Sequence, residues 1–170
     1  MKKILTVMIA AMMLMLGGCG SEDGTEVKFD AAQDLNGNTY SSSELFGANK
    51  VTMVNVWATT CSGCVDEMPD LEELNKEMAS QGVEIVGVVN DITSLDQKDL
   101  MKDAMDIVNT TGVTYRNLIH WGDSKILSSP VTPITYFVGS DGKTIGDAVL
   151  GAQLKENYKA AIEQALAAVK

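Results

Sequence analysis

Two cysteines separated by two residues, Cys61 and Cys64, are the part of this sequence whose residue types and spacing best support chemistry. They follow the apolar segment Val51–Trp57 (VTMVNVW), which is typical of a buried strand, and a helix-forming segment comes next. In the first turn of a helix, two cysteines at this spacing are close enough to form a disulfide. The unpaired N–H groups at the helix start favour the thiolate of the first cysteine. The spacing therefore predicts thiol–disulfide exchange, in which Cys61 attacks and the covered Cys64 resolves the mixed disulfide.

A βαβ unit is the element that must position these cysteines. A second apolar strand is predicted at Val83–Val89 (VEIVGVV), and Gln81-Gly82 ends the helix before it. Because parallel strands need a crossover of this length, the two strands are expected to pair in parallel. The helix between them has an apolar residue every three or four positions, at Val65, Met68, Leu71, Leu74 and Met78.

The remaining pattern predicts an α/β fold with an N-terminal β-hairpin and further helices and strands after the βαβ unit. Asn36-Gly37 predicts the hairpin within residues 28–40, and Ser42–Gly47 predicts a single helical turn. The other predicted elements are a helix at 95–109, strands at 115–119 and 134–138, an antiparallel strand at 144–150, and a helix at 154–169.

The composition excludes several classes of protein. The chain has 170 residues, of which 13 are basic and 23 acidic, for a formal net charge of −10. This acidic balance argues against a nucleic-acid-binding protein, which would carry a basic surface. Three cysteines are too few for a disulfide scaffold or a closed four-ligand zinc site. The length allows one domain.

The N-terminal residues are typical of a bacterial lipoprotein signal. Lys2 and Lys3 precede an almost wholly apolar run at residues 4–16, which ends in Gly17-Gly18-Cys19. A run of this length is short for a spanning helix and suits a secretory signal. We therefore predict a signal peptide at residues 1–18 and acylation of Cys19, which becomes the mature N-terminus. The alternatives are an ordinary signal peptide with an incidental cysteine, or an uncleaved anchor.

The small and acidic residues that follow predict a flexible tether at 19–27, between the membrane and a folded domain at 28–170. The predicted location is therefore extracytoplasmic, with the protein held at the bacterial cell membrane by its lipid.

The run from Trp57 to Pro69, Trp-Ala-Thr-x-Cys-x-x-Cys-x-x-Glu-Met-Pro, resembles the thioredoxin superfamily in its extracytoplasmic TlpA/ResA-like branch. Asn36-Gly37, both apolar strands of the βαβ unit and Thr132-Pro133 before an apolar strand extend the resemblance over nearly all of residues 28–170. The resemblance implies an α/β thioredoxin fold: a central mixed β-sheet flanked by helices, with an N-terminal β-hairpin and an inserted helix and strand in the middle. It also implies that Pro133 is in the cis form beside the disulfide, and that Thr132 and Pro133 form the substrate-docking wall. Trp57 is assigned to the same region as a cover for the disulfide; its simpler interpretation is a residue packed in the core or at its rim. Pro130 is the rival proline, but no strand follows it directly.

Several positions depart from the pattern of this family. Thr60 replaces the usual aromatic residue, and Ser62-Gly63 stands where a proline is common. Some relatives carry a buried carboxylate after the second central strand, which makes Asp91 a candidate proton relay or else a turn residue at the strand end. Asn55 stands where some thioredoxins have a buried acid, so that relay is expected to be absent.

Three acidic residues close to the cysteines have a simpler interpretation. Asp66, Glu67 and Asp70 are read as acids near the helix start that complement its dipole, and Pro69 is expected to kink the helix.

The sequence thus predicts a membrane-anchored protein disulfide reductase that needs no cofactor or metal beyond its Cys61–Cys64 disulfide. Its expected partners are an apocytochrome, a partner reductase or secreted proteins with wrong disulfides, and a membrane thiol carrier as electron donor. Copper delivery through the two cysteines, with His120 as a third ligand, is the alternative; His120 otherwise ends a strand or faces solvent. A purely structural disulfide is a further alternative.

Overall fold

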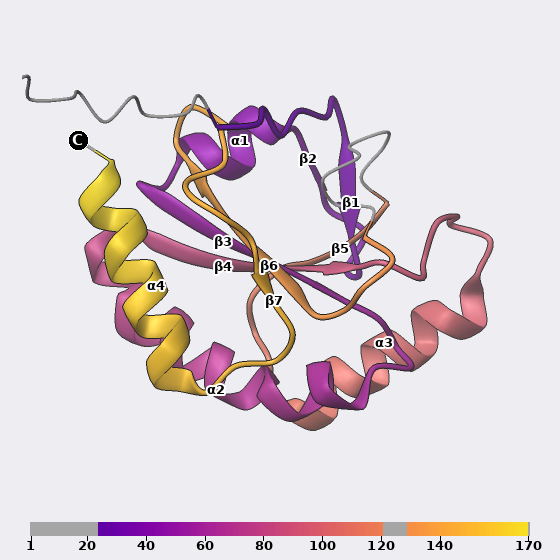
Figure 1. The fold of residues 1–170 in the computed structure, drawn as a ribbon. Helices are drawn as coiled ribbons and strands as arrows, with labels where there is room; N and C mark the ends of the chain where they lie inside the picture. Colours follow the sequence, from indigo (N-terminus) through magenta and orange to yellow (C-terminus); the bar gives the residue numbers. More distant parts are fainter. Residues whose placement is uncertain (1–23, 121–128, 170) are drawn as a thin grey trace, which may run out of the picture.

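The computed structural model describes residues 24–120 and 129–169, which form a seven-stranded mixed sheet with helices on both faces (Figure 1). The predicted signal peptide, Cys19 and the side chain of His120 lie outside the described residues. The strands are β1 (Ala32–Asp34), β2 (Thr39–Tyr40), β3 (Val51–Trp57), β4 (Val83–Val89), β5 (Asn117–His120), β6 (Ile134–Gly139) and β7 (Val149–Leu150). The helices are α1 (Ser42–Gly47), α2 (Ser62–Met78), α3 (Lys98–Thr111) and α4 (Lys155–Ala168), with a 3₁₀ turn η1 (Ala79–Gln81).

The strand order is β2-β1-β5-β4-β3-β6-β7. The two apolar strands β3 and β4 pair in parallel over their full length, with α2 as the crossover, which confirms the predicted βαβ unit. On one side, β5 continues the sheet in parallel with β4; on the other, β6 and β7 add antiparallel strands. The β1–β2 hairpin extends the sheet through β5. The predicted mixed sheet with an N-terminal hairpin and an inserted helix–strand pair is therefore confirmed.

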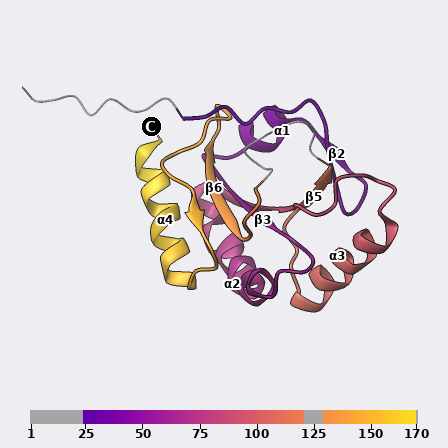
Figure 2. The ribbon, with the colours of Figure 1, turned by 45° about the vertical axis from the view of Figure 1, so that its right-hand side comes forward.

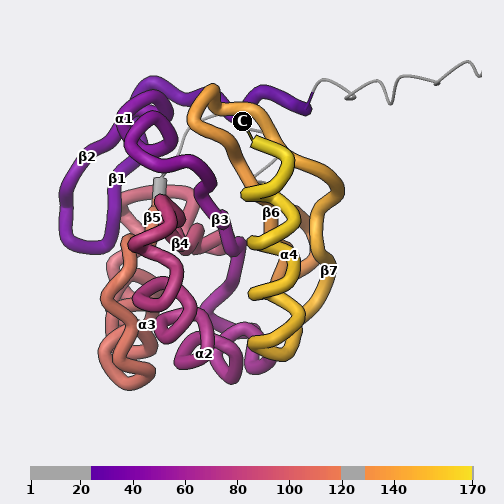
Figure 3. Tube along the Cα trace, turned by 90° about the vertical axis from the view of Figure 1, so that its left-hand side faces the viewer, coloured from indigo at the N-terminus to yellow at the C-terminus, as the bar shows by residue number. Residues whose placement is uncertain are grey.

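The two faces of the sheet carry different helices. Helices α2, α3 and α4 lie on one face and the short α1 lies on the other, as the three views show (Figures 1, 2 and 3). Side chains alternate along β3 accordingly, so Met53 and Trp57 join the α2-side core while Val54 and Val56 join the α1-side core. Asn55 lies between Val54 and Val56 on β3, so its side chain faces the α2 side. Cys61 and Cys64 lie at the junction of β3 and α2.

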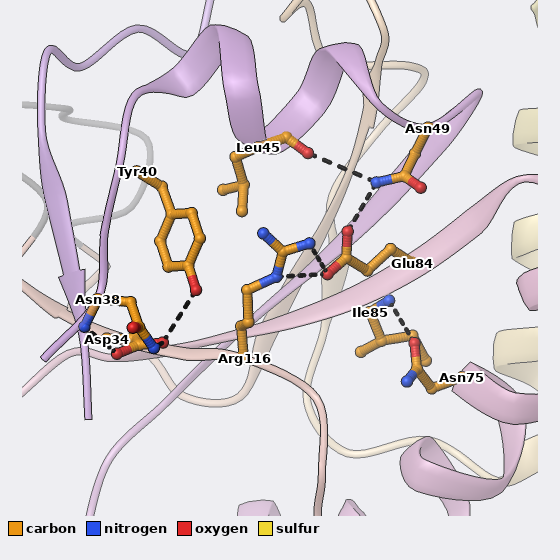
Figure 4. A network of polar contacts seen from close by, with 9 residues as sticks. All are labelled: Asp34, Asn38, Tyr40, Leu45, Asn49, Asn75, Glu84, Ile85 and Arg116. Atoms are coloured by element: carbon orange, nitrogen blue, oxygen red, sulfur yellow. Dashed lines mark hydrogen bonds and ion pairs between the residues drawn. The ribbon is translucent and has the colours of Figure 1, made fainter. Parts of the chain in front are cut away.

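A network of polar contacts on the α1 side joins the N-terminal elements to the central strands (Figure 4). The Arg116 guanidinium pairs with the Glu84 carboxylate and lies over the Tyr40 ring, 4.9 Å from its centroid. Glu84 also accepts a 2.7 Å hydrogen bond from the Asn49 side chain, while Tyr40 donates to Asp34 over 3.2 Å. These contacts connect β2, β4 and the segment before β5, so they hold the hairpin against the sheet.

Three boundaries differ from the sequence prediction. Helix α3 starts at Lys98 because the Gln97 side chain accepts hydrogen bonds from the Thr93 and Ser94 N–H groups, which makes residues 93–97 a separate turn. The predicted strand at 144–150 shortens to β7, because the chain turns at Gly146 with φ +65°. Part of the predicted tether packs on the domain: Val27 is 1% exposed, and its N–H donates to the Gly142 carbonyl over 2.8 Å. The ordered domain therefore begins before Lys28.

Candidate active site

Cys61 and Cys64 form a disulfide at the junction of β3 and α2, with their Cα atoms 5.3 Å apart. Cys61 is the N-cap of α2, and its Sγ accepts a hydrogen bond from the Cys64 N–H over 3.3 Å. In the reduced protein, the same N–H group would favour a Cys61 thiolate. Cys61 is partly exposed and Cys64 is 0% exposed. The predicted order of an accessible first sulfur and a covered second sulfur is therefore confirmed.

The loop before Cys61 is held by Asp91, which follows β4. One carboxylate oxygen of Asp91, Oδ2, accepts hydrogen bonds from the Thr59 N–H over 3.0 Å and from the Thr59 hydroxyl over 2.6 Å. The other oxygen, Oδ1, is buried and has no hydrogen-bond partner among the described residues. Asp91 is thus tied to the loop that presents Cys61.

The predicted docking segment, Thr132–Pro133, directly precedes β6. The Thr132–Pro133 peptide bond is cis, and the Pro133 carbonyl accepts a 2.9 Å hydrogen bond from the Gly151 N–H. A Cβ placed on Gly63 would lie 3.8 Å from the Ala152 Cβ, so the segment after β7 contacts both the start of α2 and the Pro133 segment. Among the described prolines, only Pro133 follows a cis bond.

Trp57 packs in the core, as its simpler interpretation from the sequence predicts, and does not form part of an exposed docking surface, which corrects its assignment to the docking region. Its side chain is 0% exposed and belongs to the same hydrophobic cluster as Cys64. The indole Nε1 donates a 2.9 Å hydrogen bond to Asn117 Oδ1, and Asn117 in turn donates to the Tyr115 carbonyl. Trp57 is therefore a core residue at the end of β3, on the α2 side of the sheet.

Gly87 in β4 leaves the space that this Trp57–Asn117 contact occupies. A Cβ at Gly87 would lie 1.9 Å from Asn117 Oδ1 and 3.1 Å from Trp57 Nε1. We expect Gly87→Ala to lower the free energy of unfolding by about 2–4 kcal/mol, because it overpacks the core and displaces a buried hydrogen bond. Urea unfolding of the oxidised protein measures this loss. Gly47→Ala is the control, since nothing lies within 4 Å of its Cβ position; equal stability of both variants would contradict the prediction.

Glu67 is the functional candidate that the sequence interpretation missed. It is not in the first turn of α2, as that interpretation assumed; it lies further along the helix and is 4% exposed. Its Oε1 accepts a 2.9 Å hydrogen bond from the Asn55 side-chain amide. Its Oε2 accepts hydrogen bonds from the Tyr158 hydroxyl over 2.9 Å and from the Gln153 N–H over 3.2 Å. A buried carboxylate is thus present in the site, carried by α2 and held by the Asn55 amide.

Burial raises the pKa of Glu67 above its ordinary value, and the hydrogen bonds from Tyr158, Asn55 and Gln153 oppose that rise. Because Glu67 follows Cys64 by three residues on α2, the two side chains share one face of the helix. The sequence contained a signal for the burial of Glu67. Glu67 stands three residues after Cys64 and four before Leu71, on the stripe that the helical pattern buries.

The fold and the site together define a protein of the thioredoxin type with a redox-active disulfide at the start of a helix. The Redoxin family model matches residues 22–162, and the chain belongs to this family. It is similar to thiol-disulfide oxidoreductase ResA of Bacillus thuringiensis (strain Al Hakam), with 29% identity over 138 residues that cover 80% of this chain and 74% of the relative. The chain is a ResA-like thiol–disulfide oxidoreductase of the thioredoxin superfamily.

Other similar proteins agree with this assignment. Thiol:disulfide interchange protein CycY of Rhizobium leguminosarum bv. viciae is 32% identical over 130 residues, which cover 69% of this chain and 61% of CycY. The solved structure of a thiol:disulfide interchange protein from Chlorobium tepidum TLS shares the fold, with a TM-score of 0.68 and 21% identity over 84% of this chain and 97% of that one.

Within residues 24–120 and 129–169, no group of three or more His, Cys, Asp or Glu side chains is arranged to hold a metal ion. In the same part of the chain, no helix has the length and apolar character that crossing a membrane requires.

Proposed function

We propose that this protein reduces disulfide bonds in extracytoplasmic proteins. The observation that carries the proposal is the pairing of an accessible Cys61 at the helix start with a fully buried Cys64. The Cys61 thiolate attacks one sulfur of a substrate disulfide, and the other substrate sulfur leaves as a thiolate and takes a proton. Cys64 then loses its proton and attacks Cys61 Sγ, which releases the second substrate thiolate. Two electrons and two protons pass to the substrate, and the Cys61–Cys64 disulfide remains.

Glu67 is our candidate for the group that accepts the Cys64 proton in this sequence. It is buried on the same face of α2 as Cys64, where water has little access, and its raised pKa lies closer to that of a thiol than the pKa of an exposed carboxylate does. Asp91 is the second candidate, and its contacts with Thr59 support a role in holding the loop before Cys61.

The charges around the cysteines favour a reductant over a strong oxidant. A disulfide oxidises strongly when its reduced thiolate is unusually stable. Residues 51–75 contain no Lys, Arg or His, whereas Asp66 and Asp70 lie on the first turns of α2. These acids oppose a thiolate at Cys61 and offset part of the stabilisation by the helix start.

We therefore expect a reduction potential more negative than about −200 mV. Equilibration of the protein with a series of reduced and oxidised glutathione mixtures measures it. A midpoint near −120 mV, which is typical of a strong oxidant, would make the protein a disulfide donor and would overturn the reductase proposal. Titration of the reduced protein with copper(I) tests the alternative of copper delivery: tight binding of one ion would favour a carrier, because the reductase needs no metal.

The proposal includes a place in the cell and a set of partners. Acylation at Cys19 would hold the domain at the outer side of the bacterial cytoplasmic membrane, where a membrane thiol carrier could reduce the Cys61–Cys64 disulfide. The substrates would be an apocytochrome, a partner reductase or secreted proteins with wrong disulfides. Thr132 and Pro133 would form the docking wall for the substrate chain, supported by the contact of the Pro133 segment with Gly151.

A further inference from the structure

The buried carboxylate of Glu67 is held by residues of β3, of α4 and of the loop before α4. Asn55 on β3 donates to one oxygen through its side-chain amide, and the same amide nitrogen donates to the Thr135 hydroxyl of β6 over 3.1 Å. Tyr158 on α4 and the Gln153 N–H, just before α4, both donate to the other oxygen. Two of the three hydrogen bonds to Glu67 therefore come from α4 and the residues that lead into it.

Tyr158 is buried among polar groups that include the Glu67 carboxylate, the Thr135 hydroxyl and the Gln153 N–H. Its side chain is 0% exposed, and its hydroxyl donates to Glu67 Oε2 over 2.9 Å. Burial raises the pKa of Tyr158, and the nearby charge of Glu67 raises it further. The hydroxyl therefore keeps its proton and acts as a donor. A buried hydrogen bond to a charged group is stronger than one between neutral groups. Tyr158 thus stabilises the ionised form of Glu67 against the cost of burial.

We propose that Tyr158 is a positioning residue of the disulfide exchange: its hydroxyl holds the Glu67 carboxylate on the Cys64 face of α2. Helix α4 carries none of the reacting atoms, but through Tyr158 it sets the position of the carboxylate that accepts the Cys64 proton. This inference rests on the proposed function, because it assigns a role within the second step of the exchange.

The other titratable groups near Glu67 lie on α2 and in the segment before β5. From the segment before β5, Tyr115 is also buried and keeps its proton, since burial raises its pKa and the charges of Glu67 and Glu72 raise it further. On α2 itself, the titratable neighbours are Cys64 and Glu72, and Glu72 is paired with Lys76 over 2.9 Å. Asn55 and Thr135 do not titrate. Among these groups, Tyr158 is the one whose hydroxyl bonds directly to the carboxylate.

Tyr158→Phe tests the proposal, because phenylalanine keeps the ring in the core and removes only the hydroxyl. The titration of Glu67 is followed in the full chain by the NMR signals of ¹³C-labelled glutamate carboxyl groups, and Glu67→Gln assigns the Glu67 signal. We expect Tyr158→Phe to raise the Glu67 midpoint by about one pH unit, which corresponds to one lost hydrogen bond to a charge.

Tyr115→Phe is the matched control. It also removes a buried hydroxyl from a tyrosine, but that hydroxyl has no hydrogen-bond partner among the described residues. The Glu67 midpoint should not move in this variant. An unchanged midpoint in Tyr158→Phe, or an equal shift in both variants, would overturn the proposal.

A kinetic measurement separates positioning from a general loss of structure. Reduced protein reacts with dithiobis(nitrobenzoate) in two steps, since Cys61 releases one coloured thiol and Cys64 releases the second. Below the Glu67 midpoint, we expect Tyr158→Phe to slow the second release about tenfold and to leave the first unchanged. In a Glu67→Gln background the same change should have no further effect, because its target is gone. If Tyr158→Phe slows the second release equally in that background, the effect does not pass through Glu67, and the inference fails while the proposed reductase function stands.

Discussion

Cys61→Ser is expected to reduce disulfide-reductase activity by about 10³-fold or more and to trap no partner, whereas Cys64→Ser is expected to accumulate mixed disulfides with its substrates. Both expectations follow from the different surroundings of the two sulfurs. Cys61 is the partly exposed N-cap of α2, and Cys64 is fully buried. We therefore expect a protein disulfide to reach only the first sulfur, and only the second sulfur to release the complex.

The comparison is made in cells, by separating proteins under non-reducing conditions after free thiols have been blocked. The double variant Cys61→Ser/Cys64→Ser, which keeps Cys19, shows any complexes that form through the third cysteine. Reduction of insulin disulfides by each purified variant gives the activity. Equal trapping by both single variants would contradict the assigned roles, since it would mean that Cys64 is accessible to protein substrates.

The second large effect is expected at Glu67. Glu67→Gln should slow the release of the mixed disulfide by Cys64 about 10²-fold, because a buried general base is removed while the shape of the side chain is kept. A carboxylate acts as a base only when ionised, so the release rate of the unmodified protein should rise with pH through the midpoint of Glu67. Burial raises the pKa of Glu67, so this rise should come at a higher pH than for an exposed glutamate. The rise should be absent in Glu67→Gln.

Stopped-flow measurement of the second thiol released from dithiobis(nitrobenzoate), between acid and neutral pH, gives the release rate. Glu73→Gln is the matched control: it makes the same chemical change on the same helix, but Glu73 is exposed and bonds to Lys155. A Glu67→Gln variant with the pH profile of the unmodified protein would exclude Glu67 as the proton acceptor and would leave Asp91 as the remaining candidate.

The sequence alone determined the βαβ unit, the position of the two cysteines at its strand–helix junction and which of the two sulfurs is covered. These features depend on local patterns. Strands β3 and β4 are continuous apolar runs, the buried side of α2 repeats every three or four residues, and a helix start presents free N–H groups wherever it occurs. The hairpin followed from the turn residues Asn36-Gly37, and the mixed sheet from the resemblance to the thioredoxin superfamily.

Only the tertiary structure decided what surrounds the disulfide. Asn55 and Glu67 belong to different elements, and Tyr158 lies 91 positions after Glu67, so no local pattern relates the three residues that the folded chain hydrogen-bonds together. The same holds for Trp57: a strand-end tryptophan suits either a docking surface or a core, and the contacts with Asn117 from β5 place it in the core. The packing of distant elements determines which side chains are buried, and buried polar groups need hydrogen-bond partners. The surroundings of these residues therefore depend on the tertiary structure and cannot be read from local sequence patterns.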